Sequence, residues 1–157
     1  MKTVALCALS VATGIASAQA AEVTPADVVF DDAGYVAAPL TDAPGDPANG
    51  AKVIASKGIG NCVACHVNSS MPDVPFQGNV GPALDGVATR YPEAMIRGIL
   101  VNSKHIFEGT VMPAYYKVDG FIRPADGFTS KPYEGPIPPL LSAQQIEDVV
   151  AYLMTLK

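Results

Sequence analysis

The chain has 157 residues, of which 49 % are hydrophobic, and its 15 acidic against 10 basic residues give a net charge of −5. This length suits one domain, the composition is not that of a disordered protein, and the acidic balance lacks the basic excess that nucleic-acid binding needs. Beyond the first twenty residues no apolar run is long enough to span a bilayer, so we expect a mature protein that is soluble and not inserted in a membrane.

Residues 1–20 have the features of a secretory signal peptide. Lys2 supplies the charged end, residues 4–15 form an apolar run, and Ala18-Gln19-Ala20 is a small-x-small cleavage site. We expect cleavage after Ala20 and export to an oxidising compartment. An uncleaved anchor is the alternative, although the run is short for a membrane span.

Residues 21–45 form an acidic arm rich in Ala, Pro and Asp. No basic residue occurs from Ala21 to Pro47, whereas acids and bases balance in the rest of the chain. We expect an irregular arm that packs over the domain or docks on a partner. A mobile terminus is the alternative, since chain ends are poorly ordered unless they are held by contacts.

The first predicted helix begins at Asp46, an Asx cap followed by Pro47 at the first helical position. Its apolar residues continue beyond Gly50, and we expect its end near Gly58 or Gly60. Gly50 weakens a helix interior unless another segment approaches closely there. We expect a crossing helix to be that segment.

The stretch Cys62-Val63-Ala64-Cys65-His66 has the spacing of a c-type haem attachment site. In such a site both sulfurs bond covalently to the porphyrin and the histidine ligates the iron. Positions i, i+3 and i+4 of a helical turn share one face, so the two thiols and the imidazole can reach the same flat cofactor. The motif therefore predicts one covalently bound haem c.

Two other interpretations of the cysteine pair have less support. A thioredoxin-like redox pair belongs to a βαβ pattern, and the strands it needs are not apparent. A zinc site needs further ligands at metal spacing, whereas the other cysteine, Cys7, lies in the signal segment and the other histidine is His105.

A ligating histidine needs an acceptor for its second ring nitrogen, because that bond fixes the ring and raises its basicity. Residues 67–78 have the composition of a loop, and Gly81-Pro82 follows soon after. We predict that the carbonyl of Pro82 accepts from His66. An ordinary Gly-Pro loop without this contact is the alternative.

Met112 is the strongest candidate for the second axial ligand. It follows a helix predicted from Glu93 to near Asn102, and Pro113 biases it toward extended backbone, from which its thioether can point into a pocket. His105 is the rival, since imidazole also ligates haem iron, and an open position is the third option. Met71 is less suitable, because it is too close in sequence to His66 to reach the other face of the haem. Met95 and Met154 occur at helical spacing among aliphatic residues, so we expect them in the core.

A histidine and a methionine on the iron leave no position for a substrate, and the thioether raises the reduction potential. Such a haem transfers single electrons and does not bind oxygen, peroxide or thiosulfate. We therefore predict outer-sphere electron transfer and no catalytic residue in this chain. A haem enzyme or gas sensor, which needs an open iron, is the alternative.

Residues 118–141 are rich in proline and glycine and show no periodicity. A connection of this length without regular structure is uncommon in a compact domain and is usually functional or mobile. We expect it beside the Met112 segment, at the haem edge or on a partner surface.

The last predicted helix has the clearest signals in the chain. Ser142 and Gln145 have the spacing of a capping box, and two prolines just before them delay the helix start. We expect this helix to pack on the first one, with Tyr152 near Gly50. Its apolar residues follow the period of an amphipathic helix: Ile146, Val149, Val150, Leu153 and Leu156.

From Asp46 onward the chain resembles the class I c-type cytochromes, which implies an all-α domain over 46–157, wrapped round one haem, with the N-terminal arm and the proline-rich insertion added. Within that group it is similar to the SoxX family, the mono-haem subunits of the cytochrome complex of the bacterial sulfur-oxidising (Sox) system. The stretches that carry this second resemblance are 60–66, 81–86, 111–115, the insertion at 118–141, and 141–153.

The resemblance implies a periplasmic heterodimer with SoxA, a second cytochrome whose own haem and modified cysteine carry the reaction. That complex, an L-cysteine S-thiosulfotransferase, oxidatively couples thiosulfate to a cysteine of the SoxYZ carrier. The present chain would accept the electrons through His66 and Met112 and pass them to a small soluble cytochrome c. A free-standing electron shuttle shares every haem feature, and a haem-free thiol oxidoreductase is a remote alternative.

Overall fold

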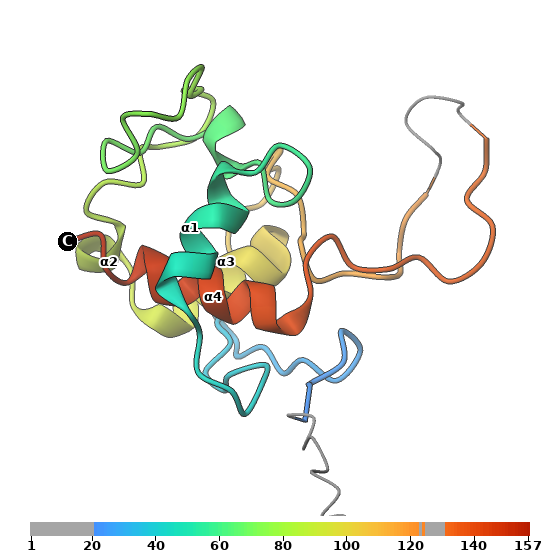
Figure 1. Cartoon of the computed structure of the whole chain (residues 1–157). Coiled ribbons are helices and arrows are strands. Elements are labelled where there is room, and N and C mark those ends of the chain that lie inside the picture. The colour runs from blue at the N-terminus through green and yellow to red at the C-terminus, as the bar shows by residue number, and fades with distance from the viewer. Residues whose placement is uncertain (1–20, 123, 125–130) are drawn as a thin grey trace, which may run out of the picture.

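The computed structural model describes residues 21–122, 124 and 131–157, and the predicted signal peptide lies outside this range. No described residue belongs to a strand, although an isolated β-bridge joins Glu22 and Thr41. The all-α prediction is therefore confirmed. The described residues form four α-helices, labelled in Figure 1, and two short 3₁₀ turns: α1 Pro47–Ala55, η1 Cys62–Ala64, α2 Val87–Arg90, α3 Glu93–Asn102, η2 Ser103–His105 and α4 Ala143–Leu153.

Helix α1 begins as predicted but ends early. The carboxylate of Asp46 accepts from the amide of Ala48 at 2.8 Å, and Pro47 occupies the first helical position. The expected end near Gly58 or Gly60 is wrong, because Ser56 is already extended, with ψ at 117°. The chain then turns back, and the amide of Gly60 donates to the carbonyl of Val53 at 3.2 Å.

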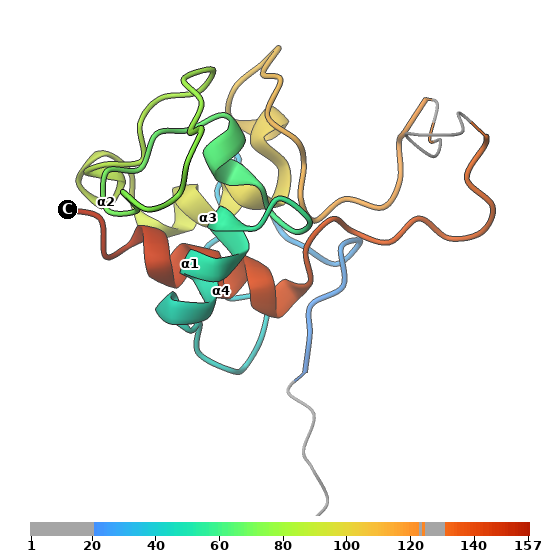
Figure 2. The ribbon, with the colours of Figure 1, turned by 45° about the horizontal axis from the view of Figure 1, so that its top comes forward.

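Helices α1 and α4 cross at close range (Figures 1 and 2). A Cβ at Gly50 would overlap the backbone carbonyl of Asp148 and lie 2.9 Å from the Cβ of Tyr152. Glycine is therefore needed inside α1, where it would otherwise weaken the helix. The predicted crossing and the proximity of Tyr152 to Gly50 are both confirmed.

The start of α4 has the predicted capping box. The hydroxyl of Ser142 accepts from the amide of Gln145 at 3.2 Å, and the Gln145 side-chain oxygen accepts from the amide of Ser142 at 2.9 Å. The inward face of the helix is fully buried, with Ile146 and Val149 both at 0 % exposure. This face makes α4 the central element of the core.

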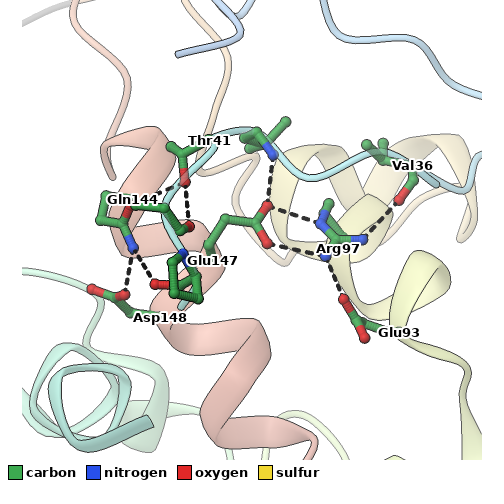
Figure 3. A network of polar contacts seen from close by, with 10 residues as sticks. Val36, Thr41, Glu93, Arg97, Gln144, Glu147 and Asp148 are labelled. Atoms are coloured by element: carbon green, nitrogen blue, oxygen red, sulfur yellow. Dashed lines mark hydrogen bonds and ion pairs between the residues drawn. The ribbon is translucent and has the colours of Figure 1, made fainter. Parts of the chain in front are cut away.

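The acidic arm at 21–45 packs across α3 and α4 (Figure 3). The amide of Val36 donates to the carbonyl of Ala94 at 3.0 Å, and Leu40 is buried. A Cβ at Gly98 would overlap the carbonyl of Gly34, so the arm backbone lies directly on α3. Of the three interpretations of the arm, packing over the domain agrees with these contacts.

A buried ion pair joins α3, α4 and the arm (Figure 3). The Nε and Nη2 atoms of Arg97 lie 2.8 and 3.0 Å from the two carboxylate oxygens of Glu147. The same guanidinium donates to the carbonyl of Val36 at 3.1 Å, and the Glu147 carboxylate accepts from the amide of Leu40 at 2.9 Å. The arm therefore contributes partners that both buried charges need.

Candidate functional site

An apolar cavity of about 380 Å³ opens between η1, α3, α4 and the loop after η2. All five residues proposed for the haem site line it, although they come from three distant stretches of sequence: Cys62, Cys65, His66, Pro82 and Met112. The remaining walls are mainly aliphatic side chains of the long helices, among them Ile54, Ile96, Ile99, Leu100, Val149 and Leu153. The cavity thus combines apolar walls with a few metal-binding and thiol groups.

The cysteine motif forms a 3₁₀ turn, not the α-helical turn on which the sequence argument relied. The carbonyl of Cys62 accepts from the amide of Cys65 at 3.1 Å and from the amide of His66 at 3.0 Å. The turn starts at Asn61, whose φ of 50° is left-handed. Both thiols and the imidazole still face one cavity, because the last residue of the motif keeps the helical hydrogen bond.

The ring of His66 is held by the segment that contains Gly81 and Pro82. Its Nδ1 lies 2.6 Å from the carbonyl oxygen of Pro82. With Nδ1 donating, a neutral ring carries its lone pair on Nε2, which is the arrangement that a metal ligand requires. A Cβ at Gly81 would overlap the ring atoms, so glycine alone lets the chain approach the imidazole so closely.

The environment of Cys62 does not favour thiol redox chemistry. Burial raises the pKa of its thiol to about 11, because an apolar environment disfavours the charged thiolate. Because the thiolate is the nucleophile in disulfide exchange, a thiol that stays protonated at neutral pH is a poor redox catalyst. The haem-free thiol oxidoreductase is therefore disfavoured.

Met112 is positioned by contacts that the sequence argument did not include. Its carbonyl accepts from the hydroxyl of Ser103 at 3.0 Å and from the ammonium of Lys104 at 2.6 Å. Its amide donates to the hydroxyl of Thr110 at 3.2 Å. Both donors to the carbonyl belong to η2, an element whose three residues are too few to give a periodic signal in the sequence.

The rival axial ligand lies elsewhere. The ring of His105 stacks on Phe30 of the N-terminal arm, with ring centroids 4.1 Å apart, and it borders a second, smaller hollow. The structure does not bring it to the cavity that contains His66. The other described methionines do not line that cavity either: Met71, Met95 and Met154.

Tyr115 is a further wall residue that sequence reasoning missed. Its hydroxyl donates to the carbonyl of Gly60 at 3.1 Å, and burial raises the pKa of its phenol. The proline-rich insertion, expected beside Met112, contributes no described residue to the cavity. Of the described residues, therefore, the insertion comes next to the site only where it begins, just after Tyr115.

The residues that are present fit a covalently attached haem. Two thiols on one turn, an oriented imidazole and a thioether surround an apolar space, which is the donor set of an imidazole–thioether cytochrome. Separately, none of the described helices is both long enough and apolar enough to cross a bilayer.

Comparison with known proteins agrees with this chemistry. Residues 47–157 match the family model described as cytochrome c. The structure is similar to a chain in the crystal structure of SoxXA from P. pantotrophus, with 54 % sequence identity and a TM-score of 0.82, over 87 % of the present chain and 98 % of that chain. Comparison with curated protein sequences gave no match.

Proposed function

This chain is a cytochrome c of the SoxX family, and we propose that it relays electrons within a thiosulfate-oxidising complex. Its fold is the predicted all-α cytochrome c fold, and it carries one covalently bound haem c. The proposal concerns which residues hold that haem, which partners it serves, and where in the cell it works.

The cavity supports an assignment of roles. All four line the cavity; Cys62 and Cys65 would hold the haem through thioether bonds, and His66 and Met112 would ligate its iron. When bound, the haem supplies reversible one-electron transfer. The apolar walls exclude water from the cofactor, and the carbonyl of Pro82 orients the imidazole.

One observation carries the relay role. His66 and Met112 line the same cavity, so this chain can supply both axial ligands from its own residues. Two strong ligands leave no open position for a substrate, which favours electron transfer over catalysis at the iron. No catalytic residue is assigned to this chain.

The partners are proposed from the relative. The solved relative is named SoxXA, and we extend this to a heterodimer of the present chain with a SoxA-type cytochrome in the periplasm, after removal of residues 1–20. The complex would couple thiosulfate to a cysteine of a SoxYZ carrier as an L-cysteine S-thiosulfotransferase. The present chain would pass the released electrons to a small soluble cytochrome c.

Reconstitution tests this function. The haem-loaded chain is mixed with its SoxA-type partner, the SoxYZ carrier and thiosulfate, and reduction of its haem is followed by absorbance. We expect reduction that depends on the partner and the carrier, followed by reoxidation when a small oxidised cytochrome c is added. A chain that remains monomeric and oxidised in this mixture would instead indicate the free-standing shuttle.

A further inference from the structure

The segment after Tyr116 leaves the body of the molecule and returns to it at Leu141. Residues 118–122 and 131–140 are orange in Figures 1 and 2, and both views show them projecting away from the helices. Its base is fixed, because Leu141 donates to the carbonyl of Tyr115 at 3.0 Å and Tyr116 donates to Val101 at 3.2 Å. We use the name proline-rich arm for its described residues, 118–122, 124 and 131–140.

The proline-rich arm exposes large apolar side chains. The exposed fractions are 97 % for Ile122, 59 % for Leu140, 47 % for Tyr133 and 44 % for Phe121. Apolar side chains scattered singly over a surface are ordinary, but several on one projecting segment indicate an interaction site. Burying an aromatic ring alone removes about 150–250 Å² from water, a substantial part of the roughly 800 Å² that each partner contributes to a standard interface.

The backbone of the proline-rich arm is suited to docking in an extended form. Proline lacks an amide donor and restricts φ, so a proline-rich segment is stiff and does not pair freely with other strand edges. Its outgoing and returning parts are joined, because the amide of Tyr133 donates to the carbonyl of Pro124 at 3.2 Å. Lys117 also lies over the ring of Phe121, 5.3 Å from its centroid. A segment already stiffened in this way loses less conformational entropy when it binds.

We propose that the proline-rich arm is the docking element for the SoxA-type subunit, and that it inserts into an apolar groove on that partner. The inference rests on the proposed function, because it requires the two-subunit complex. The match covers 98 % of the related chain, and the structure of that relative is named SoxXA. Because this name combines SoxX with SoxA, a SoxA-type chain is the partner that the comparison favours.

The base of the proline-rich arm links this surface to the redox site. Tyr115 lines the haem cavity, donates to Gly60 beside the cysteine motif, and follows Met112 by three residues. A partner bound to the proline-rich arm would therefore be connected, through Tyr115, to the wall of the haem cavity. A docking element at this place keeps the partner near the haem without occupying an axial position.

The experiment measures binding of the haem-loaded full chain to its purified SoxA-type partner by titration calorimetry. The arm variant carries Phe121→Ser and Ile122→Ser, and a second variant carries Tyr133→Ser. We expect the dissociation constant to rise about 100-fold for the double variant and about 10-fold for the single one, as for truncation of buried anchor residues. The matched control is Val29→Ser, an apolar residue of the N-terminal arm that is 81 % exposed, and it should leave the dissociation constant within about twofold of the wild-type value.

The haem absorption spectrum and the thermal unfolding midpoint should be the same for all variants, because the substituted side chains lie outside the core. Wild-type affinity in both arm variants would overturn the docking role and leave the proposed function intact. Failure of the wild-type chain to bind the partner would overturn the proposed function itself. Two further results would also overturn the proposal. One is a wild-type homodimer that becomes monomeric in the arm variants. The other is that the arm variants bind the small cytochrome c more weakly but bind the SoxA-type partner with wild-type affinity.

Discussion

The imidazole of His66 is held by a backbone carbonyl, since its Nδ1 lies 2.6 Å from the oxygen of Pro82. A neutral carbonyl is a weaker hydrogen-bond acceptor than a carboxylate, so the imidazole would be only a moderate electron donor to an iron bound at Nε2. With Met112 as the proposed second ligand, this would favour the high reduction potential expected of an electron acceptor. The orientation depends on close approach of the chain at Gly81, where no side chain fits.

Gly81→Ala should disturb the site through sterics alone. The added methyl would overlap the ring of His66, so the ring or the loop must move, and we expect the free energy of unfolding of the haem-loaded protein to fall by about 1–3 kcal/mol. Denaturant unfolding monitored by haem absorbance measures this. Gly58→Ala is the control, because a Cβ there has nothing within 4 Å. Equal effects of the two substitutions would contradict the close packing at Gly81.

Met112→Ala should open the iron to external ligands. If this thioether is the second axial ligand, its removal leaves a position that carbon monoxide can take in the reduced protein, which the wild type excludes. Absorbance titration with carbon monoxide measures the change, and His105→Ala is the control, since its ring stacks on Phe30 outside the cavity. Carbon monoxide binding in the His105 variant but not in the Met112 variant would reverse the assignment.

At the level of elements, the sequence predicts best where local signals are strong. The starts of α1 and α4 and both bounds of α3 agree with expectation, because each has a capping or proline signal next to an apolar period. Helix α2 and turn η2 are missed, because four and three residues are too few to show a period. Packing of the N-terminal arm over the domain is one of the expectations, but its contacts could not be predicted, since Leu40 and its acceptor Glu147 are 107 residues apart.

The candidate site also has features that local sequence patterns predict and features that depend on contacts between distant residues. The cysteine motif is local, and it predicts the covalent attachment and the first axial ligand from five adjacent residues. The family resemblance and the loop position of Met112 favour it as the second ligand. No local pattern, however, indicates that Ser103 and Lys104 hold its carbonyl. Those contacts arise only when η2 folds back on the loop.

The Arg97–Glu147 pair should be important for the attachment of the N-terminal arm to α3 and α4. Arg97→Met leaves the buried Glu147 carboxylate without its cation, and we expect a loss of about 3–5 kcal/mol in unfolding free energy. Glu93→Gln is the control, because the Glu93 side chain is 54 % exposed and its pair should contribute at most about 1 kcal/mol. Both values come from denaturant unfolding of the haem-loaded protein.

A double variant separates the charge from the packing. Arg97→Met combined with Glu147→Leu removes both buried charges, and it should be more stable than Arg97→Met alone, because no unpaired carboxylate remains in the core. Limited proteolysis of the arm, followed by mass spectrometry, should show the same order of protection. A double variant less stable than the single one would mean that hydrogen bonds to the arm backbone, and not the ion pair, dominate.

The molecule as a whole consists of a helical body with two extensions that are held differently (Figures 1 and 2). The N-terminal arm gives its backbone groups to buried charges of α3 and α4. The proline-rich arm has backbone hydrogen bonds to the body at its base and exposes several large apolar side chains. The body itself is interrupted by the cavity, which is bordered by α1, α3 and α4. The haem is therefore expected to complete the core as well as to carry electrons.

Loss of haem attachment should consequently unfold the body. The cavity of about 380 Å³ is lined mainly by apolar side chains, which have no packing partners on that side without the cofactor, and a typical domain has only about 5–15 kcal/mol of stability in total. The variant Cys62→Ala with Cys65→Ala cannot attach haem covalently. Its haem-free fraction should lack near-ultraviolet circular dichroism and a cooperative thermal transition, whereas the haem-loaded wild type should show both. A cooperative transition in the haem-free variant would mean that the aliphatic walls close on themselves, and that α1, α3 and α4 do not need the cofactor to pack.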